Sequence, residues 1–181
     1  MINIRSTLRL FTLVAASVFL AAAAHAVPIL GGNIVVTADS EVHVTFEGYS
    51  AGYTSQLFLQ NPGNDLGMLF VNKTTAVGST IALGTFAAGT ELIFRLFVVP
   101  TGQNFLTGDA LRNSDNIAHA YIETIGNKTF VGFEDIWGGG DRDYNDYMFS
   151  VTANPVPDSA ATGALLVLGL GALALARRRL A

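Results

Sequence analysis

The sequence contains no cysteine, which excludes disulfide bonds, thiol catalysis and cysteine-ligated zinc. A folded domain in this chain must therefore depend on its apolar core, with or without a bound metal ion. Basic residues are also scarce: residues 27–154 contain five of them against thirteen acidic residues, a formal net charge of −8. The lack of a basic stripe argues against nucleic-acid binding. The acidic excess favours cation binding and solubility outside the cell.

The first 26 residues have the three parts of a secretory signal peptide. Arg5 and Arg9 precede an apolar run from Leu10 to Ala24, and Ala24 and Ala26 are the small residues that signal peptidase requires. We therefore predict a signal helix over residues 1–26 that is cleaved after Ala26. The alternative is an uncleaved membrane anchor.

The C-terminal residues 155–181 form a second module. The motif Val156-Pro157-Asp158-Ser159 precedes an uncharged stretch over 160–176, which the basic cluster Arg177, Arg178 and Arg179 follows. As a helix this stretch would span about 26 Å, near the lower limit for crossing a bilayer. Arginines beside an apolar span stay cytoplasmic, so the preceding domain would lie outside the membrane. A plain membrane anchor would have the same features.

The tail as a whole resembles the PEP-CTERM type of sorting signal. It is closest to the variant that reads Val-Pro-Asp-Ser-Gly, although Ala160 stands here where that variant has glycine. The resemblance implies a protein of a Gram-negative-type bacterium that is exported to the cell envelope. It also implies an exosortase, a membrane transpeptidase, as the partner that cuts near the motif.

Between the two ends, residues 27–154 have the pattern of a small β-domain. Short β-branched or aromatic segments alternate with turn residues, and no stretch has a sustained helical period. The predicted strands are 33–37, 42–47, 55–60, 66–71, 81–85, 90–99, 117–124, 129–133 and 147–151. Eight or nine such strands predict an antiparallel β-sandwich, jelly-roll-like in connectivity. We expect a linker over 153–159.

The segment 132–146 is the one cluster of residues that could carry chemistry. Asp141, Asp143 and Asn145 alternate, so their oxygens can point the same way, and three consecutive glycines (138–140) permit a tight fold. Hard oxygen ligands at this spacing suit Ca²⁺. The loop is not an EF-hand, because Asp146 and Thr152 stand where that loop requires Gly and Glu. The alternative is a solvated acidic turn.

The same segment resembles the signature of a family of secreted bacterial proteins, catalogued as domain of unknown function 4114. The resemblance rests on Gly-Phe-Glu-Asp at 132–135, the triple glycine, and Asp-Arg-Asp-Tyr-Asn-Asp at 141–146. It implies no established activity. The site residues that it implies are Glu134, Asp135, Asp141, Asp143, Asn145 and Asp146.

We therefore expect a non-enzymatic, calcium-stabilised β-domain with a structural or adhesive role at the cell surface or in the extracellular matrix of a biofilm. One alternative is an exopolysaccharide-binding module, in which Trp137, Tyr144 or Tyr147 stacks on sugar rings. Another is a hydrolase with two carboxylates about 5 to 10 Å apart. His119, which follows Asp115 and Asn116, is expected to make a structural hydrogen bond.

Overall fold

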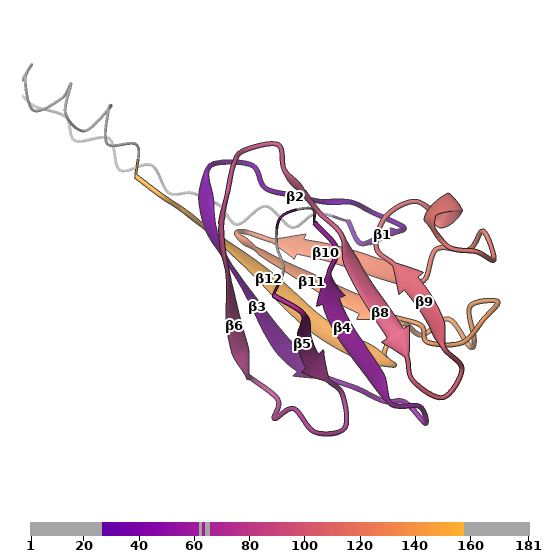
Figure 1. The fold of residues 1–181 in the computed structure, drawn as a ribbon. Helices are drawn as coiled ribbons and strands as arrows, with labels where there is room; N and C mark the ends of the chain where they lie inside the picture. Colours follow the sequence, from indigo (N-terminus) through magenta and orange to yellow (C-terminus); the bar gives the residue numbers. More distant parts are fainter. Residues whose placement is uncertain (1–26, 62, 64–65, 158–181) are drawn as a thin grey trace, which may run out of the picture.

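The computed structural model describes residues 27–61, 63 and 66–157 (Figure 1). In this part the chain is all-β apart from one short 3-10 helix, η1 (Ala110–Arg112), which confirms the predicted class. Within the same residues no helix is long and apolar enough to cross a membrane. The predicted signal helix with Ala24 and Ala26, the predicted membrane helix, and Arg177 to Arg179 lie outside the described residues.

Two antiparallel sheets form most of the domain. The larger sheet has six strands in the order β1-β10-β11-β12-β3-β6. Their bounds are β1 Ile29–Leu30, β3 Ser40–Gly48, β6 Thr80–Phe86, β10 Ala120–Ile125, β11 Lys128–Phe133 and β12 Tyr147–Pro155. Three consecutive strands, β10 to β12, form a meander at its centre, and β12 then pairs with β3 from the other end of the sequence.

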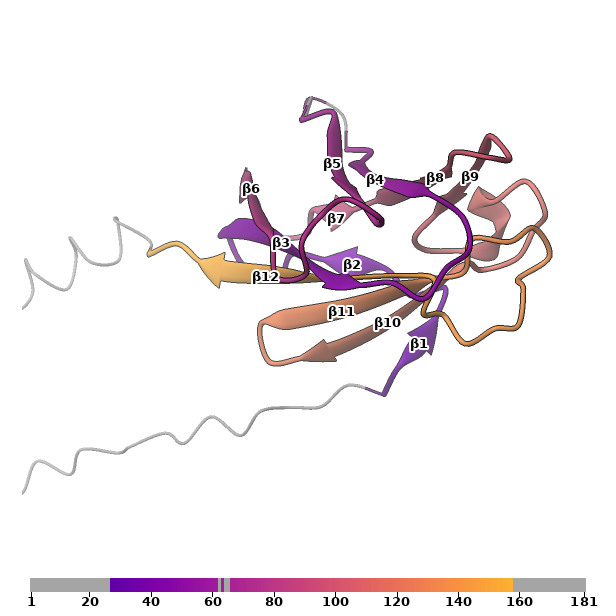
Figure 2. The same ribbon diagram turned by 90° about the horizontal axis from the view of Figure 1, so that it is seen from below.

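The second sheet has four strands in the order β5-β4-β8-β9. These are β4 Ser55–Leu59, β5 Met68–Val71, β8 Phe94–Val98 and β9 Gln103–Leu106, while β2 (Ile34–Val35) and β7 (Glu91–Leu92) form a separate two-stranded pair. Seen from below, the sheets lie in two layers, with the six-stranded sheet under the four-stranded one (Figure 2). The antiparallel sandwich is thus as predicted; the strand order alone does not establish the jelly-roll-like connectivity, which stays a prediction.

The core lies between the layers and follows the period of two that strands impose. On β3, Val42, Val44 and Phe46 are fully buried, and the residues between them are more exposed. Phe149 of β12 meets Phe94 of β8 across the core, with ring centroids 4.8 Å apart. Apolar contact between the two sheets is therefore what holds a domain without disulfide bonds together.

The predicted long strand over 90–99 is wrong in one respect, because it divides at Ile93 into β7 and β8. The side-chain oxygen of Asn61 accepts a hydrogen bond from Ile93 N at 3.0 Å, in place of a ladder bond. Leu92 and Phe94 are buried on both sides of the break. The alternation of buried and less buried residues therefore continues through Ile93, although the chain passes there from one sheet to another. The hydrophobic pattern of the sequence does not reveal this break.

Other boundaries also differ from the prediction. Strand β10 begins at Ala120 rather than Ile117, because side chains of Asp115 and Asn113 bind the backbone of Ile117. Strands β1 and β9 were not predicted. The expected linker over 153–159 is wrong at its start, because β12 continues to Pro155, which pairs with Ser40.

Removing Phe149 should test the core directly. Phe149→Ala is expected to lower the free energy of unfolding by about 3–5 kcal/mol, since the ring is fully buried and a cavity would remain. Urea denaturation of the purified chain measures the change. Leu111→Ala is the matched control, because Leu111 is 78 % exposed and its loss should change stability by less than about 0.5 kcal/mol. Equal effects of the two substitutions would contradict this description of the core.

Candidate metal centre

The residues predicted to bind metal lie in the loop 134–146, here called the acidic loop, which joins β11 to β12. Its two ends are fixed by backbone hydrogen bonds: Glu134 N donates to His119 O, and Ser50 N donates to Asn145 O, each at 2.9 Å. Because β11 and β12 are antiparallel neighbours in the six-stranded sheet, the loop begins and ends at the same end of the sandwich. It lies at the end opposite to the one where the chain leaves β12 (Figure 1).

Three carboxylates of the acidic loop converge. One oxygen from each of Glu134, Asp141 and Asp143 lies within 4.8 Å of the others. Glu134 is fully buried, whereas Asp141 and Asp143 are exposed. The arrangement therefore has a buried base and an open mouth, which a cation could enter from solvent.

Glu134 carries the unusual feature of this cluster. Its Oε1 accepts a hydrogen bond from Tyr144 N at 2.8 Å, but its Oε2 has no hydrogen-bond partner among the described residues. Burial raises the pKa of Glu134, and the charges of Asp146, Asp141 and Asp143 raise it further, against the lowering effect of the Tyr144 N–H. A buried carboxylate oxygen without a partner is costly, and a bound cation would satisfy it.

The triple glycine is required by the shape of the loop, as the sequence predicted. Gly138, Gly139 and Gly140 all have positive φ, at 84°, 85° and 48°. A Cβ on Gly140 would lie 2.4 Å from Oε2 of Glu134. Any other residue at 140 would therefore fill the space in front of the unpartnered oxygen.

Asp141, Asp143 and Asn145 do not alternate along an extended strand, because the residues between them have unusual backbone angles. Arg142 and Tyr144 adopt φ of 65° and 52°, in the left-handed region. Asn145 donates a hydrogen bond from its amide Nδ2 to Asp143 Oδ2, and its N–H donates to Asp143 Oδ1 at 3.2 Å. Asn145 thus fixes the orientation of Asp143 and joins the cluster through it.

The remaining two predicted residues, Asp135 and Asp146, form a separate pair. Asp135 Oδ2 accepts a hydrogen bond from Ser55 Oγ of β4 at 3.0 Å, and Asp135 N donates to Asp146 Oδ2 at 3.0 Å. Burial and the charge of Asp146 raise the pKa of Asp135 to about 6. These contacts attach the acidic loop to the four-stranded sheet, so this pair is distinct from the three converging carboxylates.

Asp115 and His119 support the loop from behind. The ring of His119 is fully buried and stacks on Phe105 at 3.7 Å between centroids. Its Nδ1 contacts Glu134 O at 3.0 Å and its Nε2 contacts Asp115 Oδ2 at 2.8 Å, which confirms the expected structural hydrogen bond. Asp115 Oδ2 also accepts from Gly138 N at 3.0 Å. The sequence signalled Asp115 only through its position four residues before His119, and it gave no signal for Ser55.

A known family includes the segment that holds the acidic loop. Residues 51–154 match the family described as Domain of unknown function (DUF4114). The chain belongs to this family. The match covers β4 to β12 and includes the whole acidic loop. A search of curated proteins found no match.

Residues 155–180 match the VPDSG-CTERM motif, directly after the DUF4114 domain. This motif marks an exported protein that an exosortase-type system sorts, so processing by an exosortase-like enzyme follows from it. Val156 and Pro157 are exposed at the end of β12, and Val156 N donates to Asp39 O at 2.9 Å. Asp158 and Ser159 lie outside the described residues.

The pKa of Asp135 gives the DUF4114 domain a testable pH dependence. The folded state raises this pKa from 3.8 to about 6, so folding favours the protonated form. The contribution of Asp135 to stability is therefore complete below about pH 4 and is lost as pH rises through 6. In EDTA, the stability of the natural chain relative to Asp135→Asn should fall between pH 4 and 6.5. Urea unfolding at several pH values measures this, and a difference that stays constant with pH would contradict it.

Proposed function

We propose that the DUF4114 domain binds one Ca²⁺ at Glu134, Asp141 and Asp143, and that it is a structural or adhesive module at the cell surface or in the extracellular matrix. One observation carries the proposal: the fully buried carboxylate of Glu134 has an oxygen, Oε2, without a hydrogen-bond partner among the described residues, and one oxygen of this carboxylate lies within 4.8 Å of oxygens from Asp141 and Asp143. Three negative charges this close repel one another unless a cation lies between them.

Calcium fits this site better than other metals. All three side chains supply hard oxygen atoms, and no cysteine is available to select zinc or copper. Ca²⁺ accepts irregular shells of six to eight oxygens, whereas Mg²⁺ demands a tight octahedron. Asp141 and Asp143 are exposed, which leaves room for water to complete a calcium shell.

A non-enzymatic role is part of the proposal. One oxygen from each of the three carboxylates lies within 4.8 Å of the others, so the groups converge on one point, whereas the two carboxylates of a glycosidase flank an open cleft about 5 to 10 Å wide. The position of the loop supports an adhesive role instead. Strand β12 runs for nine residues between the acidic loop and the sorting tail, so the loop faces away from the end that the membrane would hold.

Calcium should stabilise the purified chain. At a hundredfold excess over Kd, a ligand of the folded state adds about 2.7 kcal/mol, which for a domain of this size raises Tm by roughly 10 °C. EDTA should reverse the rise, and Mg²⁺ at equal concentration should produce less of it. Differential scanning calorimetry measures the effect, and equal melting temperatures in Ca²⁺ and EDTA would show that the loop is only a solvated turn.

Glu134→Gln separates metal binding from a simple structural role. The substitution keeps the shape of the side chain and removes one of the three repelling charges, so Tm in EDTA should not fall while the response to Ca²⁺ is lost. Glu41→Gln is the matched control, because Glu41 is exposed on β3 and remote from the loop. A variant that melts lower in EDTA and still responds to Ca²⁺ would refute the assignment.

The sorting tail predicts a processed protein. If Val156 to Ser159 is the processing motif, protein released from the cell surface should lack residues 160–181. Intact-mass spectrometry of the released protein gives the C-terminal residue. A released species that still ends in the arginine cluster 177–179 would identify the tail as a plain membrane anchor.

A further inference from the structure

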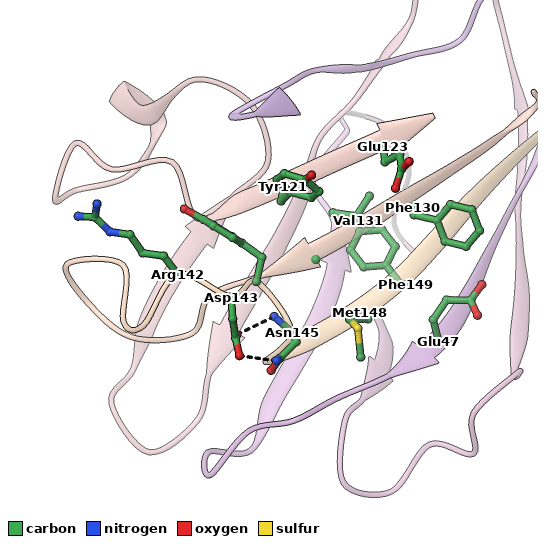
Figure 3. Close-up of a pocket in the computed structure, with 12 residues that line it drawn as sticks. Glu47, Tyr121, Glu123, Phe130, Val131, Arg142, Asp143, Asn145, Met148 and Phe149 are labelled. Atoms are coloured by element: carbon green, nitrogen blue, oxygen red, sulfur yellow. Dashed lines mark hydrogen bonds between the residues drawn. The ribbon is translucent and has the colours of Figure 1, made fainter. Parts of the chain in front are cut away.

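The acidic loop forms one wall of a cleft on the outer face of the six-stranded sheet. The cleft has a volume of about 540 Å³ and is floored by outward side chains of β10, β11 and β12, with Tyr121, Phe130 and Met148 among them (Figure 3). These residues alternate with buried core residues, so they occupy positions that on a solvated strand are usually polar. Aromatic and apolar residues at these positions indicate a binding surface.

Tyr144 enters this cleft because the acidic loop lies directly on β11. A Cβ on Gly132 would be 2.1 Å from Tyr144 O, so only glycine permits the contact. The ring of Tyr144 then stacks with Tyr121, with centroids 5.9 Å apart and an angle of 25° between the planes. Two tyrosines from different segments thus form one stacked aromatic pair at the cleft.

A second hollow, of about 450 Å³, shares Arg142 and Tyr144 with the first. It extends past the acidic loop toward Leu30 of β1 and Asp109. The two hollows adjoin at Arg142 and Tyr144, which line both. We call the two hollows together the outer trough, and two adjoining hollows suit a polymer that occupies several subsites.

The outer trough is lined by four carboxylates and one guanidinium, that of Arg142. Glu47 is paired with Lys128 at 2.8 Å, and Asp143 belongs to the proposed calcium site. Asp109 accepts a hydrogen bond from Leu111 N at 2.8 Å, which leaves Glu123 and Arg142, neither of which forms an ion pair within the described residues. They lie at opposite ends of the cleft, and Asn145 lies near the Arg142 end (Figure 3). Unpaired donors and acceptors beside an aromatic pair suit hydroxyl groups, and the net charge of −8 over residues 27–154 disfavours a polyanion.

We propose that the outer trough binds a neutral polysaccharide chain, with Tyr121 and Tyr144 stacked on sugar rings and Glu123, Arg142 and Asn145 bound to hydroxyls. This rests on the proposed function, because the calcium loop positions the trough wall: Tyr144 N donates to Glu134 Oε1, and Asp143 belongs to both the metal cluster and the trough. Calcium therefore preorganises Tyr144 for the sugar, which raises affinity without any contact between metal and glycan.

Binding to neutral hexasaccharides of glucose, galactose, mannose and N-acetylglucosamine tests the proposal. We expect the full chain in Ca²⁺ to bind at least one of them by calorimetry, with affinity that rises from disaccharide to hexasaccharide. A hexauronate should bind at least tenfold more weakly than the best neutral glycan. If no neutral hexasaccharide binds, or if the hexauronate binds more tightly, the proposal is overturned.

Substitutions locate the glycan. Tyr121→Ala and Tyr144→Ala should each reduce affinity about tenfold, and Glu123→Gln should reduce it severalfold. Tyr53→Ala is the matched control, because Tyr53 is a comparably exposed tyrosine outside the trough. If Tyr144→Ala lowers Tm, Tyr121→Ala and Glu123→Gln decide the question. Unchanged affinity in both of these variants overturns the proposal.

The same samples separate this proposal from the calcium proposal. A calcium-dependent rise in Tm without glycan binding overturns only the glycan site, and glycan binding that EDTA does not weaken overturns the coupling to calcium. Size-exclusion chromatography adds a further outcome. A dimer that Tyr121→Ala converts to monomer would show that a second copy of the chain covers the trough, and that result would also overturn the proposal.

Discussion

A carboxylate removed from water is the constraint around which the functional end of this domain is built. Glu134 is fully buried directly after β11 and, within the part of the chain that the structure describes, has one oxygen without a hydrogen-bond partner. Leaving such a group unpaired costs several kcal/mol, which is a large share of the stability of a small domain. Gly140 leaves the space in front of that oxygen open, and His119 binds the backbone carbonyl of Glu134. These neighbours fix the carboxylate in place and do not neutralise it.

Glu134 lies where β11 meets the acidic loop, so it affects both the stability of the domain and the shape of the outer trough. Through Tyr144 N, the carboxylate positions the loop over the outer face of the sheet. Through Asp135, which accepts from Ser55, the same loop is attached to the four-stranded sheet. A short loop thus contacts both layers of the sandwich. Any cation that satisfies Glu134 would be expected to stabilise both layers and the wall of the outer trough together.

Local patterns predicted much of the fold because a strand with one buried face has a period of two. The alternation of Val42, Val44 and Phe46 with polar residues predicted β3 in this way. The break at Ile93 was not visible, because the inward positions on both sides of it stay apolar and only the pairing partners change. Strand β9 was missed because the sequence between turn residues offers one buried aromatic, Phe105, and little alternation.

By itself the sequence determined the all-β class, the sorting tail, the family and the stretch of chain that holds the acidic residues, because all of these are local patterns of composition and spacing. Only the tertiary structure divided the six predicted ligands. Glu134, Asp141 and Asp143 converge, Asn145 joins them through Asp143, and Asp135 with Asp146 turns toward Ser55. Neighbours in sequence such as Glu134 and Asp135 point to different partners because successive side chains lie on opposite faces of an extended backbone. Which face meets a second carboxylate, and which meets another sheet, depends on residues far away in the chain.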